Sequence, residues 1–320
     1  MDMVGRGDAT RTRNRRFWRP MLYQLSHSPL TNVYYIYLKD IMSMKKERLM
    51  RFEIGFVGAG NMGGAIINNV FQNKHLVNLD SNNIIICDTD LNKLSYYESL
   101  GFNTTTNIDD VLNKANITFF AIKPQTFSQL SFSNKSILSQ YIVSIMAGVS
   151  IAKIREVTNF NGPIIRAMPN LPCLDGNGTI GITYPNTCNR QEMNLINSIF
   201  NVCGETIEIP EHQFDALTSI SGSGPAYVFY FLKSLIDAGV DVGLTQEISS
   251  KLVFNTFLGS TLFAINSKDS LEELITKVSS KGGTTVEAIN VFRTENLDEI
   301  ILNGVKACAA RSKQLSEVKQ

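Results

Sequence analysis

Three glycines constrain the fold of this chain more than any other feature of its sequence. Gly58, Gly60 and Gly63 form the pattern Gly-x-Gly-x-x-Gly, directly after the apolar run Phe52–Val57 and before residues 61–71, whose apolar side chains have helical spacing. In such a strand–turn–helix unit the first glycine permits a tight turn, the second lets a pyrophosphate approach the backbone, and the third lets the helix press on the strand. Free N–H groups at the helix N-terminus then face the phosphates. The pattern predicts a dinucleotide-binding site; a glycine-rich turn without a ligand is the alternative.

Strand and helix signals alternate from residue 51 to residue 210. The strands are expected in short, continuous apolar runs at residues 52–57, 84–86, 117–122, 141–145, 163–168, 179–183 and 206–209. Continuous rather than alternating runs are typical of parallel strands that are covered on both faces. Polar, helix-compatible stretches such as 91–100 separate them. The sequence therefore predicts an α/β fold with a doubly wound, mostly parallel sheet of the Rossmann type in residues 51–210.

Strand signals vanish after Pro210, and helix starts follow one another instead. Pro225 stands at a favourable first helical position, Thr245 can cap a helix through residue 265, and Ser270-Leu-Glu-Glu273 is a capping box. We expect residues 211–320 to form an all-helical domain. Its phenylalanines give it more apolar surface than a bundle of about a hundred residues hides easily, which predicts a subunit interface.

Composition narrows the class of protein. Of the 320 residues, 43% are hydrophobic and 18% are charged, and the net charge is +1. These values are typical of a globular protein and disfavour one that coats nucleic acid. The clean apolar runs are shorter than the ~18–20 residues of a membrane helix. Five widely spaced cysteines and three histidines, without a Cys-x-x-Cys pair, predict neither a disulfide scaffold nor a bound metal. We expect a soluble, cytoplasmic protein.

The first fifty residues differ from the rest in charge. Residues 1–51 hold eleven Lys and Arg against four Asp and Glu, and five arginines crowd around Trp18. We expect residues 1–50 to be a disordered extension, or the product of a start codon placed too far upstream, since Met44 to Met50 lies directly before the first strand. An organellar transit peptide and a nucleic-acid or membrane-binding tail are the alternatives.

Polar residues at the ends of the expected strands add to the cofactor hypothesis. Asp88 follows the second strand, where a carboxylate accepts hydrogen bonds from an adenosine ribose and repels a 2′-phosphate. The next residues, 89–92, contain no arginine, so the sequence favours NADH over NADPH; a helix-capping role for Asp88 is the alternative. Asn107 is a plausible adenosine contact. Ala121-Ile122-Lys123-Pro124 closes the third expected strand, and we favour Lys123 lying along the ribose or nicotinamide over a catalytic role.

Several motifs together resemble the pyrroline-5-carboxylate reductases over residues 52–315. In order along the chain they are Gly58–Gly63, Ala121–Pro124, Met146-Ala147-Gly148, Arg166-Ala-Met-Pro-Asn170, Ser221-Gly-Ser-Gly-Pro-Ala-Tyr227 and Val278-Ser-Ser-Lys-Gly-Gly-Thr-Thr285. The last two are far more specific than the glycine pattern alone. The resemblance implies a Rossmann domain followed by a helical dimerisation domain. It implies reduction of 1-pyrroline-5-carboxylate to L-proline, the last step of proline synthesis, with NADPH or NADH, by a homodimer that builds up to a decamer in many members.

Cofactor contacts are expected from the motifs at the strand ends. They are Val57, Gly58, Ala59, Gly60, Asn61, Met62, Gly63, Asp88, Asn107, Ala121, Ile122, Lys123, Pro124, Met146, Ala147 and Gly148.

The substrate is a small anion with a C=N bond, so it needs a carboxylate anchor and a proton for nitrogen. Thr284 can serve as N-cap, with its hydroxyl turned to the N–H of Glu287. The N–H groups of Thr284 and Thr285 are then free to hold the carboxylate. Thr285, at the first helical position, keeps its hydroxyl, and the resemblance implies that it hydrogen-bonds the ring nitrogen as the catalytic residue. Two threonines that only start a helix are the alternative.

Other residues around this turn complete the expected substrate site. Gly283 belongs to the turn itself, Glu211 matches a family position near the substrate, and Lys277 brings positive charge to the loop. Arg166 is a tempting carboxylate clamp, but we favour a structural role for it.

Three residues depart from the family pattern: Leu171 replaces a small threonine, Lys281 a proline and Lys277 a polar residue. The first is compatible with tolerated packing, while the two lysines could help an anionic substrate or mark an altered specificity. Two other functions stay open. One is a Rossmann reductase of the β-hydroxyacid dehydrogenase type, although its catalytic lysine has no counterpart in Ser221–Ala226. The other is an NAD(P)-binding protein without catalysis.

Overall fold

The structure is a computed structural model that describes residues 52–132 and 137–317. The expectations for residues 1–50 therefore lie outside the described residues.

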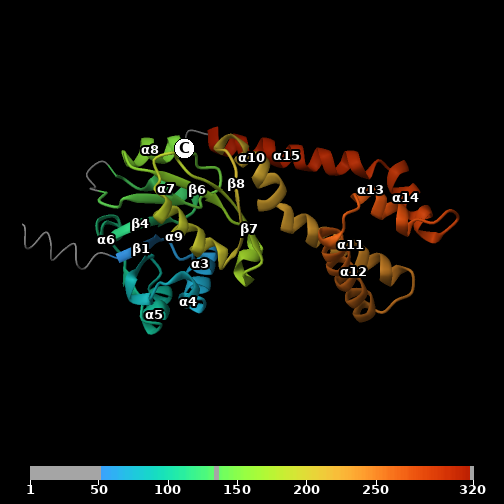
Figure 1. Ribbon diagram of the computed structural model, residues 1–320, viewed down its shortest axis with the longest axis horizontal. Coiled ribbons are helices and arrows are strands. Elements are labelled where there is room, and N and C mark those ends of the chain that lie inside the picture. Colours follow the sequence, from blue (N-terminus) through green and yellow to red (C-terminus); the bar gives the residue numbers. More distant parts are fainter. Residues whose placement is uncertain (1–51, 133–136, 318–320) are drawn as a thin grey trace, which may run out of the picture. The chain divides into compact units, whose positions relative to one another are not determined.

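One sheet of eight strands forms the centre of the first half of the described chain (Figure 1). Its strands are β1 (Phe52–Val57), β2 (Ile84–Cys87), β3 (Asn103–Thr105), β4 (Ala115–Phe120), β5 (Tyr141–Ser144), β6 (Ile164–Met168), β7 (Gly178–Thr183) and β8 (Gly204–Glu208). They lie in the order β3-β2-β1-β4-β5-β6-β7-β8. Every neighbouring pair is parallel except β6 and β7, which are antiparallel. The predicted doubly wound, mostly parallel sheet is confirmed.

The strand order reverses beside β1, which pairs with β2 on one side and with β4 on the other. In sheets of this kind, ligands bind outside the carboxyl ends of the strands at such a switch point. The short strand β3 (Asn103–Thr105) escaped prediction because its three side chains are polar and sit at the sheet edge. Ala121–Pro124 therefore follows the fourth strand and not, as expected, the third.

Helices cover both faces of the sheet. One face packs against α3 (Asn61–Gln72), α4 (Lys74–Val77), α5 (Leu91–Ser99) and α9 (Arg190–Asn201), and the other against α6 (Ile108–Lys114), α7 (Pro124–Gln129) and α8 (Ile151–Thr158). Short 3-10 turns stand at Ser81–Asn83 and Leu171–Asp175. Two-sided covering is the physical reason for continuous apolar strands.

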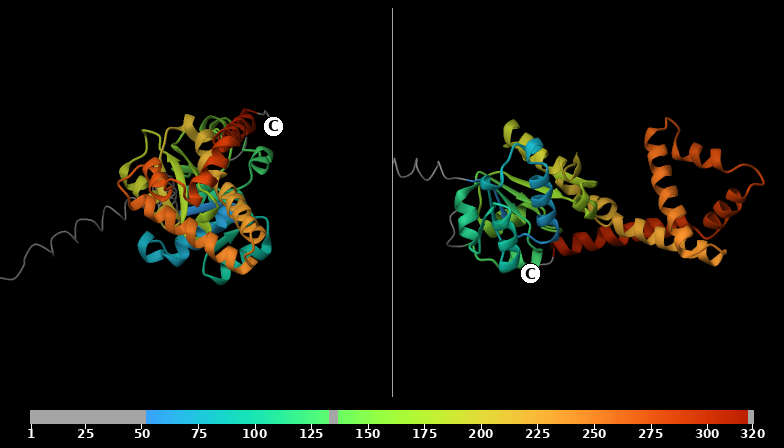
Figure 2. Two further views of the ribbon diagram at one scale, coloured as in Figure 1. Left: turned by 90° about the vertical axis from the view of Figure 1, so that its right-hand side faces the viewer. Right: turned by 90° about the horizontal axis from the view of Figure 1, so that it is seen from below.

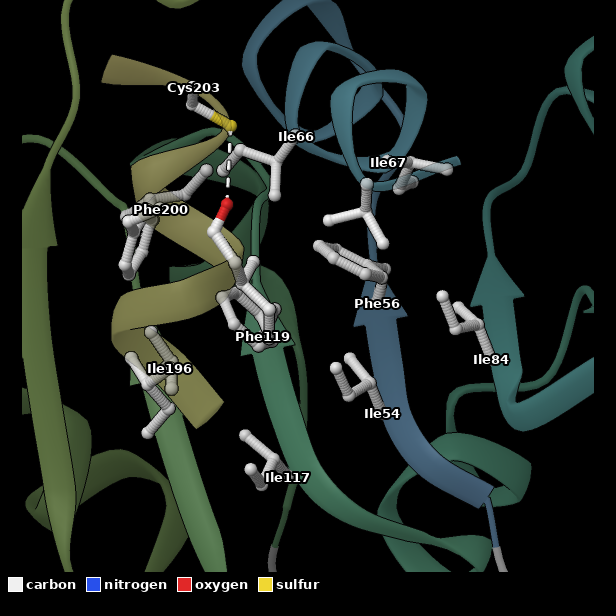
Figure 3. Close-up of a cluster of buried hydrophobic side chains, with 14 of the residues drawn as sticks. Ile54, Phe56, Ile66, Ile67, Ile84, Ile117, Phe119, Ile196, Phe200 and Cys203 are labelled. Carbon is white, nitrogen blue, oxygen red and sulfur yellow. Dashed lines mark hydrogen bonds between the residues drawn. The ribbon is translucent and has the colours of Figure 1, made fainter. Parts of the chain in front are cut away.

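The larger core cluster lies between β1, β4 and the helices α3 and α9 (Figure 3). Phe56 and Phe119 stack there with ring centroids 4.8 Å apart, and both side chains are fully buried. Their neighbours along the chain, Val57 and Phe120, are buried in the cluster on the opposite face. Adjacent residues of one strand thus enter different cores, and the ends of β1 and β4 are fixed from both sides.

Only helical elements follow β8 in the part of the chain that the structure describes (Figure 2). They are a 3-10 turn (Glu211–Gln213), α10 (Phe214–Leu217), a π-helical turn (Thr218–Gly222), α11 (Gly224–Asp241), α12 (Gln246–Asn266), α13 (Leu271–Val278), α14 (Thr284–Thr294) and α15 (Leu297–Glu317). The side chain of Thr245 accepts from the N–H of Ile248, and Ser270 forms its capping box with Glu273. These two predicted helix starts are confirmed.

Apolar side chains on α12 are largely exposed within one chain. Phe254, Leu258, Leu262 and Phe263 are each more than half exposed, and Ile265 is 73% exposed. By length and composition alone, α12 is also apolar enough to cross a membrane. A surface of this kind is typical of a helix that is covered by another molecule.

Candidate cofactor and substrate site

The glycine-rich turn after β1 has the backbone that its sequence predicts. Gly58 has φ +99°, which disfavours residues with a side chain, and its N–H donates to the carbonyl of Cys87 at 2.7 Å. Gly60 is the N-cap of α3 and makes no side-chain capping bond. The first N–H groups of α3 are therefore not capped by a side chain and remain available to an anion.

The turn and the end of β4 meet at the switch point. The N–H of Ala121 donates to the carbonyl of Val57 at 2.9 Å. A Cβ on Gly63 would come within 2.5 Å of the Gly58 carbonyl oxygen and 2.9 Å of the Ala121 Cβ, whereas a Cβ on Gly60 would meet nothing within 4 Å. Gly63 is thus required by packing, and Gly60 presents bare backbone to open space. This cradle fits a dinucleotide pyrophosphate.

Two further cofactor motifs follow neighbouring strands. After β4, Lys123 is exposed and occupies the N-cap position of α7, with Pro124 at the first helical position. After β5, Met146 is buried and Gly148 has φ +70°. Since β4 and β5 are parallel neighbours, both motifs lie at the same edge of the sheet as the glycine-rich turn. The specific role of Lys123 stays a prediction.

Asp88 connects the end of β2 to the glycine-rich turn. Its Oδ2 accepts from the N–H of Ala59 at 2.8 Å, and its Oδ1 accepts from the N–H of Asp90 at 2.9 Å. Burial favours the neutral acid, but the N–H groups of Asp90 and Ala59 and the ammonium of Lys93 outweigh it and lower the pKa of Asp88. The N-cap of α5 is Asp90, whose side chain accepts from Asn92. The capping alternative for Asp88 is therefore wrong.

Lys93 escaped prediction. Its Nζ lies 3.5 Å from Oδ2 of Asp88, and Lys93 directly follows residues 89–92, which contain no arginine. The expected helix at 91–100 could have indicated this contact. Side chains of a helix point toward its N-terminus, so a side chain in the first turn of α5 lies near the end of the strand that precedes the helix.

Asn107 has a structural use. It is the N-cap of α6, and its Oδ1 accepts from the N–H of Asp109 at 3.0 Å. Its contact with adenosine stays a prediction, with the side-chain oxygen already engaged by the helix.

Glu211 and Arg166 form one structural unit. Oε1 of Glu211 accepts from the N–H of Ile151, the first residue of α8, at 2.7 Å and from Nη1 of Arg166 at 3.4 Å. Arg166 is buried, and its guanidinium lies 4.5 Å from the ring centroid of Phe214. Burial lowers the pKa of Arg166, and Glu211 opposes that shift. This geometry agrees with the structural role favoured for Arg166. The substrate contact of Glu211 stays a prediction.

The turn before α14 differs from its prediction by one residue. Gly283, with extended φ −85° and ψ 164°, is the N-cap, so Thr284 is the first helical residue and Thr285 the second. The expected cap by Thr284 is wrong, because φ +73° at Gly282 and the bond from the N–H of Gly283 to the Ser280 carbonyl bring the chain into the helix earlier. No side chain caps α14. Its first N–H groups are therefore more available to a carboxylate than expected.

The lysines of this segment have different surroundings. Lys277 pairs with Asp269, and this contact lowers the pKa of Asp269. The ammonium of Lys277 thus has a partner in its own chain, and its contact with substrate stays a prediction. Lys281 is exposed beside Gly282. Leu171, which replaces the small threonine of the family pattern, is 45% exposed, in keeping with tolerated packing.

The structure brings the expected cofactor residues together more fully than the expected substrate residues. The turns after β1, β2, β4 and β5 share the carboxyl edge of the sheet. Among the described residues, no hydrogen bond or ion pair joins this edge to Gly283, Thr284 or Thr285. The site accordingly has two parts, the cofactor edge and the turn before α14 with its uncapped N–H groups.

Two family models and the sequences of known proteins match this chain. The family described as pyrroline-5-carboxylate reductase dimerisation matches residues 211–315, and the family described as NADP oxidoreductase, coenzyme F420-dependent, matches residues 53–148. A pyrroline-5-carboxylate reductase of Staphylococcus saprophyticus is 30% identical over 265 residues, 82% of this chain and 97% of that protein.

Solved structures of similar proteins also match this chain over most of its length. The pyrroline-5-carboxylate reductase of Coxiella burnetii is 30% identical with a TM-score of 0.73, over 83% of this chain and 99% of that one. The Plasmodium falciparum pyrroline carboxylate reductase, solved with NADP bound, is 28% identical with a TM-score of 0.71, over 84% of this chain and 99% of that one.

Proposed function

We propose that this chain, which belongs to the pyrroline-5-carboxylate reductase family, reduces 1-pyrroline-5-carboxylate to L-proline with NADPH or NADH. The observation that carries the proposal is the pair of anion-binding elements in one chain of this family. The bare backbone at Gly60 suits a pyrophosphate, and the uncapped start of α14 suits a small carboxylate.

The cofactor edge has a binding task. The bound nicotinamide cofactor supplies the hydride. The N–H groups that begin α3 would hold its pyrophosphate, and Asp88 at the end of β2 would contact its adenosine ribose. Ala121–Pro124 and Met146–Gly148 line the remaining part of the edge and would hold the nicotinamide.

The turn before α14 has an orienting and a proton-holding task. The N–H groups of Thr284 and Thr285 bind the substrate carboxylate at the positive end of the helix. The hydroxyl of Thr285 then lies beside the ring and donates a hydrogen bond to the imine nitrogen, or holds a water that does. Positive charge on that nitrogen draws electron density from the carbon that accepts hydride. The carbon gains the hydride, and the nitrogen gains a proton that the Thr285 hydroxyl passes on from water. The two products are proline and the oxidised cofactor.

Turnover tests the proposal directly. Purified full-length protein is mixed with NADPH or NADH and 1-pyrroline-5-carboxylate, and loss of nicotinamide absorbance is followed together with proline formed. We expect equal amounts of proline and oxidised cofactor. Reduction of NADP+ by a β-hydroxyacid, with no oxidation of NADPH by the imine, would favour the alternative dehydrogenase. Binding of cofactor with no turnover would favour the non-catalytic alternative.

We propose that the chain forms a homo-oligomer through its helical part, as a dimer that builds up to a decamer. The support is the match of residues 211–315 to a dimerisation family and the exposed apolar face of α12. Leu258→Lys places a charge on this face and should weaken association of the subunits, because the ammonium group must lose water on burial. It should therefore lower the mass measured by sedimentation and reduce turnover.

Leu76→Lys is the matched control for Leu258→Lys, since Leu76 on α4 is equally exposed. It should leave the sedimenting mass unchanged. A wild-type monomer that partitions into lipid vesicles would contradict the oligomer and assign α12 to a membrane.

A cytoplasmic location is proposed on the state of the thiols. All five cysteines are free, and Cys87, Cys173 and Cys203 are buried. Free thiols persist in a reducing compartment. Fractionation of cells that express the full chain tests this location against an organellar one.

A further inference from the structure

The ion pair between Lys93 and Asp88 changes what the end of β2 offers to a nucleotide. Judged from the sequence, Asp88 stands alone and repels a 2′-phosphate. In the structure its carboxylate receives the N–H groups of Ala59 and Asp90 and lies 3.5 Å from the ammonium of Lys93. A carboxylate with three donors has little charge left uncompensated, so the repulsion expected from sequence is weakened.

Lys93 is also placed to reach a ligand. Its side chain is 41% exposed, while that of Asp88 is only 11% exposed, so the ammonium is the more accessible partner. It lies in the first turn of α5, which contains no acidic side chain; the acidic N-cap Asp90 is turned to the N–H of Asn92. An ammonium on a flexible stem is a common phosphate ligand in proteins.

We propose that Lys93 is a specificity residue that neutralises Asp88 and binds the 2′-phosphate of NADPH, so that this edge accepts NADPH as well as NADH. The inference rests on the proposed use of a nicotinamide cofactor. It assigns the discrimination between the two cofactors to a pair rather than to Asp88 alone. Asp88 keeps its structural contact with Ala59 in either complex.

Equilibrium binding tests the proposal without the imine substrate. Dissociation constants for NADPH, NADH, adenosine 2′,5′-bisphosphate and AMP are measured by calorimetry on wild type and Lys93→Met. Loss of one charge-assisted phosphate contact should raise the constants for NADPH and the bisphosphate ~5–50-fold. Those for NADH and AMP should change less than ~2-fold, since neither carries the 2′-phosphate.

Two variants serve as controls. Lys93→Arg should retain most NADPH affinity. Lys233→Met removes a similar exposed ion pair, with Asp237, but on α11 and outside the cofactor edge, so it should change nothing. Two results would overturn the proposal. One is that Lys93→Met weakens the binding of NADPH and NADH equally, including loss of both; the other is that its affinity for NADPH is unchanged. Because no turnover is measured, failure here is distinguishable from failure to reduce pyrroline-5-carboxylate.

Discussion

Replacing Thr285 with alanine should lower kcat/KM for pyrroline-5-carboxylate by ~10–10³-fold, the usual effect of losing one positioned proton donor. Thr285 is the second residue of α14, partly buried, beside N–H groups that no side chain caps. Its hydroxyl is the group that the proposed reaction places at the imine nitrogen. Steady-state kinetics at saturating cofactor measure the effect.

The same substitution should leave the fold and the cofactor edge intact. Gly283 and not a threonine is the N-cap of α14, so alanine at 285 removes no capping bond. We therefore expect the melting temperature and the dissociation constant of NADPH to match wild type. Thr285→Ser should recover much of the lost kcat/KM, because it restores the hydroxyl without the methyl group.

If Thr285→Ala keeps the kcat/KM of the wild type, the proton comes from water without the help of this hydroxyl. The turn would then only grip the carboxylate. Thr284→Ala is the comparison for this case, since Thr284 lies one residue earlier and is exposed. A larger loss in Thr284→Ala than in Thr285→Ala would move the proposed proton donor to Thr284.

Sequence patterns predicted the sheet well because burial on two faces leaves a strong signal. Phe56 and Val57 enter opposite cores, so β1 can be recognised from apolar residues alone. The strand β3 carries Asn103, Thr104 and Thr105 and has no such signal. Its place at the sheet edge comes from backbone pairing with β2, which local composition does not encode.

The sequence predicted the backbone of the candidate site where glycine is required. It predicted less well which groups the polar side chains contact. Gly58 and Gly63 follow from backbone geometry and packing that a motif records. The N-cap of α14 was misplaced because Thr284 and Glu287 match a capping box, while the conformation of Gly282 and Gly283 decides where the helix begins. The partner of Asp88 depends on how the first turn of α5 returns to β2.

Gly60→Ala and Gly63→Ala should separate binding of the cofactor from stability of the fold. Gly60 has φ −72°, which alanine adopts without strain, and its Cβ would meet nothing within 4 Å. Alanine there should leave the cofactor-free melting temperature nearly unchanged. The new methyl group would occupy the space where the pyrophosphate approaches, so the dissociation constants of NADPH and NADH should both rise ~10–100-fold.

Gly63→Ala should instead damage the cofactor-free protein. Its Cβ would lie 2.5 Å from the carbonyl oxygen of Gly58, a backbone atom that cannot move without displacing the turn. Overpacking of this kind typically costs ~1–3 kcal/mol of unfolding free energy. Thermal melts without cofactor and calorimetric titrations with it measure both quantities for both variants. If Gly60→Ala binds NADPH as wild type does, the pyrophosphate does not lie against this turn, and the cofactor edge assigned here is misplaced.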